Sequence, residues 1–152
     1  MRTTIGIGLA AAGALAAGLA GGGLAGAQEG AQVMRLTSVE QHCGTADNGR
    51  RGESLGDLLA CRGALRNAAG ERAGRAHWTC VFLGSERLGE DCSAAVNLRG
   101  GTLQAAGLLR HTSPRSEWAV TGGTGRYAGA RGTVALRQLS PTRTAAVITL
   151  LP

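Results

Sequence analysis

The chain has 152 residues, a formal net charge of +6 and only four aromatic side chains, two Trp, one Tyr and one Phe. Every basic side chain is Arg, and these residues are scattered along the sequence. A nucleic-acid-binding protein would concentrate such charge and interleave it with stacking aromatics, so we expect no nucleic-acid partner and interpret the charge as a solubilising surface.

The first 27 residues have the form of a secretory signal peptide. Arg2 is the only charge before Glu29, and the Ala-, Gly- and Leu-rich segment between them closes with the small-x-small cleavage pattern of residues 25–27. A membrane anchor is the alternative for an apolar segment of this length, but its many glycines and the cleavage pattern favour removal. We therefore expect a signal peptide over residues 1–27 and one secreted domain over residues 28–152, with no membrane attachment after cleavage.

Four cysteines remain in the mature chain, and an even number in a small secreted domain predicts two disulfides. The spacings between Cys43, Cys61, Cys80 and Cys92 are 18, 19 and 12 residues, so there is no C-x-x-C pair, and no His is placed as a partner. This pattern does not fit the common zinc sites, and we expect no metal.

The first part of the mature chain alternates short apolar stretches with glycine-rich polar ones. Residues 32–40 alternate apolar and polar side chains and predict a strand, and a polar loop is expected over residues 43–53. Residues 55–65 are apolar again. A short helix is the alternative there, but the glycines within this stretch favour a bent strand, followed by a turn over residues 67–74.

The clearest alternation in the chain lies at residues 76–83. A polar loop over residues 84–91 separates it from a second alternating stretch, residues 92–98. One face of this pair carries most of the bulky apolar groups, namely Ala76, Trp78, Cys80, Phe82, Cys92, Ala94, Val96 and Leu98. The two stretches are therefore expected to form an antiparallel hairpin.

The hairpin suggests how the cysteines pair. If it is centred near Glu86, Cys80 lies opposite Cys92 on the same face, which favours a cross-strand disulfide. Cys43 would then pair with Cys61. Sequence alone does not fix the connectivity, so this pairing is a hypothesis.

The remainder of the chain also reads as short strands joined by turns. Gly100 and Gly101 favour a tight hairpin turn. Strands are expected over residues 102–109, 118–121, 132–139 and 143–151, with a polar loop at 111–115. No segment has a convincing helical period, and about eight short strands of regular spacing predict an all-β protein, either a closed antiparallel barrel or a sandwich.

A glycine-rich stretch, residues 122–132, joins two of these strands and holds five glycines. Residues 123–128 fit the dinucleotide fingerprint G-x-G-x-x-G/A. That fold needs a long helix after the glycines and an acidic residue about 20 positions further on, but Gly129 and Gly132 interrupt any helix and no acidic residue follows Glu117. We therefore interpret the stretch as a turn between two strands, with no nucleotide cofactor.

Residues 117–132, EWAVTGGTGRYAGARG, resemble the signature of dirigent proteins and of the related allene oxide cyclase-like barrels of bacteria. Weaker matches occur in the same order upstream, at residues 56–57, 65–70, 74, 80, 92–95, 98–103 and 106–107. The resemblance covers most of residues 55–150. It implies an eight-stranded antiparallel β-barrel, often trimeric, with an apolar pocket in its mouth.

The resemblance also nominates ligand-binding residues. Arg131 matches an Arg thought to line the family's pocket, Glu117 matches an acidic residue before the apolar strand, and Tyr127 matches an aromatic in the turn. Trp78, on the apolar face of its strand, is expected in the barrel wall and joins this set. Active plant members carry an acidic residue in their second strand where this chain has Gly63. No catalytic residue is assigned.

These observations predict a secreted barrel that binds a small apolar or phenolic molecule, without a cofactor, and steers its cyclisation or coupling. The alternative is a secreted barrel that binds a ligand or serves a structural role without turnover. The glycine stretch and Arg131 fit both, because they also serve the fold, so the sequence leaves open whether the protein is an enzyme.

Overall fold

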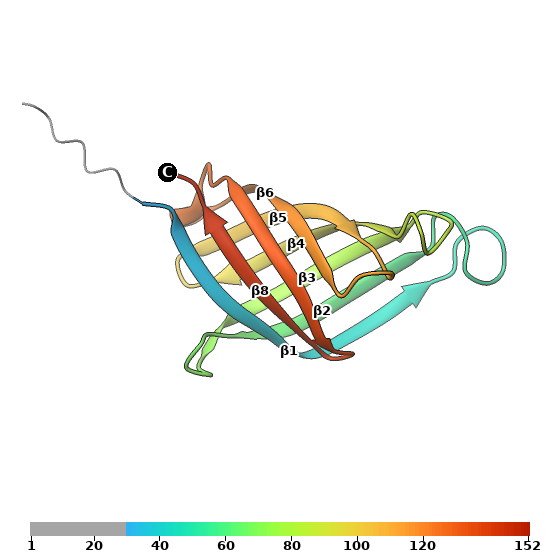
Figure 1. Ribbon diagram of the computed structural model, residues 1–152, viewed down its shortest axis with the longest axis horizontal. Coiled ribbons are helices and arrows are strands. Elements are labelled where there is room, and N and C mark those ends of the chain that lie inside the picture. Colours follow the sequence, from blue (N-terminus) through green and yellow to red (C-terminus); the bar gives the residue numbers. More distant parts are fainter. Residues whose placement is uncertain (1–29) are drawn as a thin grey trace, which may run out of the picture.

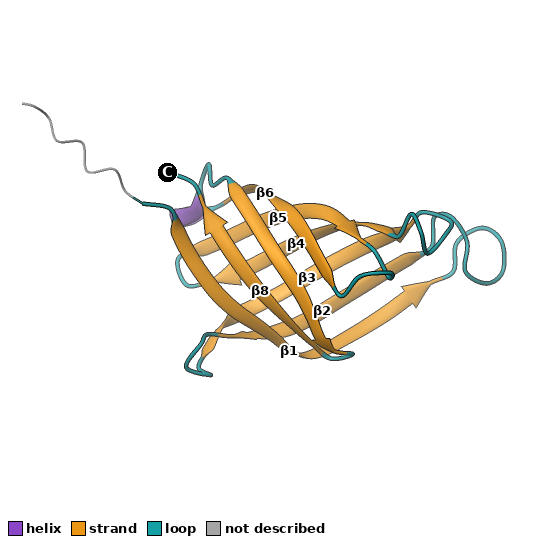
Figure 2. Cartoon of the chain, viewed as in Figure 1, coloured by secondary structure: helices purple, strands orange, loops and turns teal. Residues whose placement is uncertain are grey.

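The computed structural model describes residues 30–152, and the expected signal peptide lies outside the described residues. Eight antiparallel strands follow one another around a closed barrel, and the last strand pairs with the first (Figures 1 and 2). The strands are β1 (Gln32–Ala46), β2 (Leu58–Arg66), β3 (Arg72–Phe82), β4 (Glu90–Leu98), β5 (Gly101–Leu109), β6 (Arg115–Gly123), β7 (Gly132–Ser140) and β8 (Arg143–Leu150). The predicted eight-stranded barrel is confirmed. Within the described part of the chain, no helix is long and apolar enough to cross a bilayer.

The strand β1 is longer than the sequence predicts. It runs past residue 40 through a bulge between Val39 and His42 and ends at Ala46, so the expected loop over residues 43–53 was wrong at its start. The polar residues at this end of β1 form a strand because they pair with β2. Long-range strand pairing overrides a weak local preference for strand. Residues 55–65 form no helix, since β2 begins at Leu58.

Both disulfides join residues directly opposite one another on neighbouring strands. Cys43 and Cys61 link β1 to β2 with Cα atoms 4.1 Å apart, and Cys80 and Cys92 link β3 to β4 with Cα atoms 4.0 Å apart. The pairing is the one that the hairpin register suggested.

The glycine-rich stretch joins β6 to β7, which are antiparallel, and its only helical part is a single 3-10 turn, η1 (Gly125–Tyr127). Backbone hydrogen bonds tie it to the β4–β5 turn, from Thr124 N to Thr102 O at 2.8 Å and from Arg126 N to Gly100 O at 2.9 Å. The stretch therefore closes one end of the barrel, as Figure 1 shows beside the C-terminus. We call this the closed end; it comprises the turns over residues 67–71, 99–100 and 124–131.

The close approach of these two turns requires glycine. Gly125 has a φ of +60°, and a Cβ atom there would overlap the carbonyl oxygen of Gly100. Gly129 also has a positive φ, +74°, but a Cβ atom there would meet nothing within 4 Å. Substitutions at these two glycines therefore separate the free-energy cost of a left-handed backbone from the cost of steric overlap.

We predict that Gly125→Ala destabilises the barrel more than Gly129→Ala. The control variant bears only the left-handed backbone cost of about 1 kcal/mol, whereas overlap in Gly125→Ala should bring its loss to about 3 kcal/mol. Urea unfolding of a chain that begins at Gln28 measures both. Equal losses would show that the two turns do not need to touch.

The loop over residues 47–57 is organised by one carboxylate. Asp57 accepts hydrogen bonds from the backbone N of Asn48 at 2.8 Å and of Ser54 at 2.7 Å, and from the Ser54 hydroxyl at 3.3 Å. The Asn48 amide first, and then the Ser54 groups, hold the pKa of the Asp57 carboxyl below its ordinary value. This loop lies at the end of the barrel opposite the glycine stretch.

A lowered folded-state pKa means that the Asp57 contribution to stability is complete above the ordinary Asp value and is lost as pH falls through the lowered value. We predict that the NMR amide shifts of Asn48 and Ser54 titrate together, with a midpoint below that of an unperturbed Asp. A midpoint at the ordinary value, or independent titrations, would contradict this account of the loop.

Candidate functional site

A cavity of about 620 Å³ lies inside the barrel, lined by inward side chains from all eight strands. It extends to the loop over residues 110–114 and to Pro141. We call this end of the barrel the open end; its loops are residues 47–57, 83–89, 110–114 and 141–142. No residue of the closed-end turns lines the cavity.

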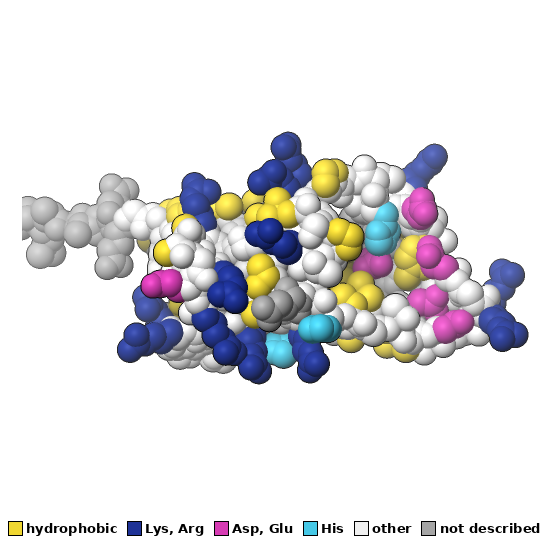
Figure 3. Space-filling view, turned by 90° about the horizontal axis from the view of Figure 1, so that it is seen from below, with side chains coloured by type: hydrophobic (Ala, Val, Ile, Leu, Met, Phe, Trp, Pro, Cys, Tyr) yellow, Lys and Arg dark blue, Asp and Glu magenta, His cyan; other side chains and the backbone are white. Residues whose placement is uncertain are grey.

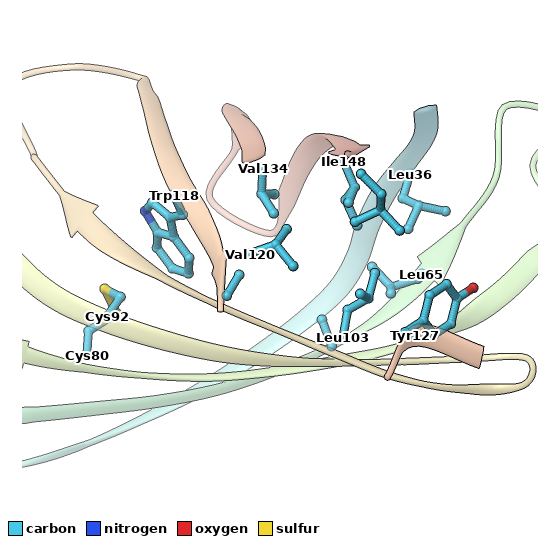
Figure 4. Packing of buried hydrophobic residues seen from close by; sticks show 13 residues of the cluster. Leu36, Leu65, Cys80, Cys92, Leu103, Trp118, Val120, Tyr127, Val134 and Ile148 are labelled. Atoms are coloured by element: carbon cyan, nitrogen blue, oxygen red, sulfur yellow. A yellow bond between two sulfur atoms is a disulfide. The ribbon is translucent and has the colours of Figure 1, made fainter. Parts of the chain in front are cut away.

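Side-chain size explains why the interior is filled at one end and empty at the other. At the closed end Leu103 and Tyr127 are 2% and 6% exposed and pack with Leu65, as Figure 4 shows. Around the cavity, alanines take many inward positions: Ala76, Ala94, Ala105 and Ala146. An eight-stranded barrel is just wide enough for side chains to fill it or for one small ligand, so a run of small residues leaves space.

The wall of the cavity is mainly apolar, and Trp118 is the larger of the side chains that β6 contributes to it. Its indole Nε1 donates to Leu108 O at 3.2 Å. Its ring lies over Gly107, where a Cβ atom would be 2.5 Å from Cδ1. The absence of a side chain at that position therefore lets the indole lie flat against the barrel wall and shape the cavity.

One buried hydroxyl in the cavity has no partner. Ser38, on β1, is 7% exposed and lines the cavity, and among the described residues its Oγ has no hydrogen-bond partner. Leaving a buried polar group unsatisfied costs about 1–3 kcal/mol, so most such groups in folded proteins are paired. This hydroxyl is therefore available to a bound molecule.

A short polar chain lies near Ser38 toward the open end. Gln41 Nε2 donates to Thr144 Oγ1 at 3.1 Å, and Thr144 Oγ1 donates to Gln138 Oε1 at 3.3 Å. All three residues line the cavity. Together with Ser38 they give one side of an apolar cavity a small set of hydrogen-bonding groups, which is the usual composition of a small-molecule site.

A second polar pair lies at the open end. Glu90, the first residue of β4, is 9% exposed, and its Oε1 lies 3.1 Å from Nε2 of His111, which lines the cavity. Within residues 30–152, Oε2 of Glu90 has no hydrogen-bond partner. Glu90 also lies near the sulfurs of Cys80 and Cys92, but these are bonded to each other and provide no thiolate for a metal.

The structure brings one of the four nominated ligand-binding residues to the cavity. Trp78 lines it. Tyr127 is buried at the closed end, Arg131 is exposed and donates from Nη2 to Pro152 O at 2.8 Å, and Glu117 is exposed on the outer face of β6. Ligand binding by these residues is not tested by their positions and stays a prediction.

Ser38, Glu90 and His111 were missed by the sequence reasoning. For Glu90 a signal was present, because it precedes Cys92 by two residues and a strand that alternates puts both on the same face. The sequence predicted a loop over residues 84–91, which includes Glu90, whereas β4 begins at Glu90.

The position of the missing family acid faces the interior. Gly63 is buried on β2, and a Cβ atom there would overlap Oγ of Ser38. The backbones of β1 and β2 therefore leave no room for a carboxylate at residue 63 unless Ser38 moves. The polar group at this place in the barrel is the unpaired Ser38 hydroxyl.

Charge is unevenly spread over the surface. Figure 3 shows Arg side chains over much of the molecule and acidic side chains gathered toward the open end. Acidic residues in or beside the open-end loops include Asp47, Glu53, Asp57, Glu86 and Asp91. The entrance to the cavity is therefore less positive than the overall charge suggests.

Comparison with known families matches residues 30–151 to the model for dirigent-like proteins. No curated protein matches the sequence. Among solved structures, a pyocyanin demethylase is 24% identical with a TM-score of 0.69, over 78% of this chain and 99% of that one.

Two further structures share the fold. The Diels–Alderase AbmU from Streptomyces koyangensis is 18% identical with a TM-score of 0.63, over 79% of this chain and 63% of that one. The pterocarpan synthase dirigent protein GePTS1 is 17% identical with a TM-score of 0.60, over 79% of this chain and 85% of that one. At these identities the likeness concerns the fold.

We predict that Ser38→Ala stabilises the ligand-free protein by about 1 kcal/mol, because it removes a buried hydroxyl that has no partner. Ser93→Ala on the outer face of β4 is the control and should change stability by less than about 0.5 kcal/mol. Urea unfolding measures the free energy of unfolding of both variants and of the unmodified protein. A destabilised Ser38→Ala would mean that the hydroxyl is satisfied in solution.

Proposed function

The chain belongs to the family of dirigent-like proteins, and from this premise we propose that it binds one small, largely apolar molecule inside the barrel and steers its cyclisation or coupling. We propose that it does so outside the cell. Two disulfides support an oxidising compartment, together with the signal peptide expected from the sequence. The trimer that the resemblance implies stays a prediction.

The cavity carries this proposal. Its volume of about 620 Å³ lies within the range of small-molecule sites, about 300–1,000 Å³. A barrel with a purely structural role has no need of such a space, because interior packing supplies stability. The unpaired Ser38 hydroxyl adds a polar group that a ligand could satisfy.

The physical means of steering is selection of one conformer. Rigid walls such as Trp78 and Trp118 restrict how a flexible molecule can lie, and a difference of about 1.4 kcal/mol between two barriers changes the product ratio tenfold. Excluding water also protects reactive intermediates from hydrolysis. A Diels–Alderase and a pterocarpan synthase dirigent protein with this fold lend support to chemistry of this kind.

A binding barrel without turnover is the second candidate. It is favoured by the positions of Arg131 and Glu117, which lie outside the cavity, and by Gly63, where the family's acid is missing. Both candidates require a molecule inside the barrel. Binding is therefore the first property to test.

We predict that the protein binds 2-methoxynaphthalene, an apolar probe of suitable size, and that Ala146→Phe weakens this binding at least tenfold. Ala146 lines the cavity, so a phenyl ring there takes up its space. The neighbouring residue Ala145 does not line the cavity, so Ala145→Phe should leave the affinity for the probe unchanged. Probe fluorescence measures binding, and circular dichroism confirms that both variants fold.

Failure of the unmodified protein to bind any apolar probe of this class would contradict the proposal. Equal binding by a folded Ala146→Phe variant would place the probe elsewhere on the molecule and contradict it as well.

A further inference from the structure

We propose that His111 is the proton-transfer group of the barrel and that Glu90 is its positioning residue, which defines the ligand as a small apolar molecule with an acidic O–H, a phenol or an enol. This inference rests on the proposed function and adds a reacting group to it. The observation behind it is a buried carboxylate joined to an imidazole that lines the cavity.

Glu90 is held inside the barrel by the register of its strand. It pairs with Phe82 on β3 and with Leu109 on β5, and it faces inward with Cys92 two residues later. The carboxylate is therefore anchored at a fixed place between two strands. An ion pair on the surface contributes little, but a carboxylate this buried needs a compensating partner.

His111 connects this carboxylate to the cavity. Its side chain is 45% exposed and belongs to the loop over residues 110–114, which ends the cavity at the open end. An ionised carboxylate only accepts hydrogen bonds, so in the neutral ring Nε2 carries the proton that points to Glu90 Oε1. Nδ1 then presents a lone pair, and among residues 30–152 it has no hydrogen-bond partner.

This arrangement suits transfer of a proton from a ligand hydroxyl. The ligand O–H bond breaks, its electron pair stays on oxygen, and a new N–H bond forms at Nδ1. Glu90 stabilises the resulting imidazolium and keeps the ring oriented. The oxygen anion then adds to an electron-poor C=C bond of the same molecule, so that a C–O bond forms as the π bond breaks. The proton on Nδ1 passes to the carbanion carbon, and the sequence is an isomerisation that needs no oxidant or reductant.

A merely structural role is the competing explanation, in which the pair fastens the loop over residues 110–114 to the barrel. Such a role uses the same hydrogen bond from Nε2 to Glu90 Oε1 and therefore needs the same tautomer, but it involves no proton transfer to Nδ1. The tautomer of His111 therefore tests whether Glu90 orients the ring, and the ionisation of a bound phenol separates proton transfer from a merely structural role.

The first experiment determines the tautomer by ¹⁵N NMR of the three His side chains, with His111→Gln assigning the signals of residue 111. We expect the Nε2–H form in the unmodified protein at a pH where the ring is neutral. Glu90→Gln should produce a mixture of tautomers. Asp91→Asn, one residue along β4 on the outer face, is the control and should change nothing. An Nδ1–H form, or no change in Glu90→Gln, overturns the positioning role.

The second experiment compares 2-naphthol with 2-methoxynaphthalene, which lacks the acidic proton. We expect both to bind, and at one fixed pH we expect bound 2-naphthol to show a several-fold larger naphtholate absorbance than free 2-naphthol. His111→Gln should abolish this increase and Glu90→Gln should reduce it, and the absorbance is compared at probe concentrations that saturate each variant. His77→Gln, exposed on the outer face of β3, is the control.

The outcomes distinguish the two proposals. If neither probe binds, the proposed function is overturned and this inference with it. If both bind but the naphtholate absorbance is the same in the unmodified protein and in His111→Gln, the cavity stands and the proton-transfer role is overturned.

Discussion

The hydrogen bonding of β8 to β1 is the constraint on which the rest of the structure depends. Seven residues of β1 pair with residues 144–150, which turns a meander of eight strands into a barrel without free edges. Closure fixes the width of the interior, and a barrel of eight strands holds either side chains or one small molecule. The glycine-rich stretch closes one end because Gly125 can lie against Gly100. The alanines toward the other end leave the cavity.

The interior carries polar features that stability alone does not explain. The Ser38 hydroxyl and one carboxylate oxygen of Glu90 are buried without partners among the described residues, and each lowers the stability of the empty barrel. Natural proteins accept such costs mainly at functional sites. Both groups lie beside or near a cavity that remains after the strands have packed, whereas the closed end is filled by apolar side chains such as Leu103.

Alternation along the strands made an all-β protein and the Cys80–Cys92 hairpin predictable from sequence, because a period of two assigns each side chain to a face. The resemblance to dirigent proteins favoured the barrel over a sandwich, and the glycines favoured a turn over residues 122–132. The site was harder to predict. The interior position of Glu90 depends on where β4 begins, and strand ends are set by long-range pairing with β3 and β5. The motif that carries Arg131 is needed for closure of the barrel, so its presence could not show where a ligand binds.

Whether the barrel holds a small molecule is tested most directly by a crystal structure of residues 28–152 with 2-bromonaphthalene, whose bromine gives an anomalous signal. We predict one strong anomalous peak inside the barrel, between Trp78 and the β8 wall at Ala146. A peak only on the outer surface, or an interior in which side chains have repacked to fill the space, would contradict the claim that this barrel holds a small molecule.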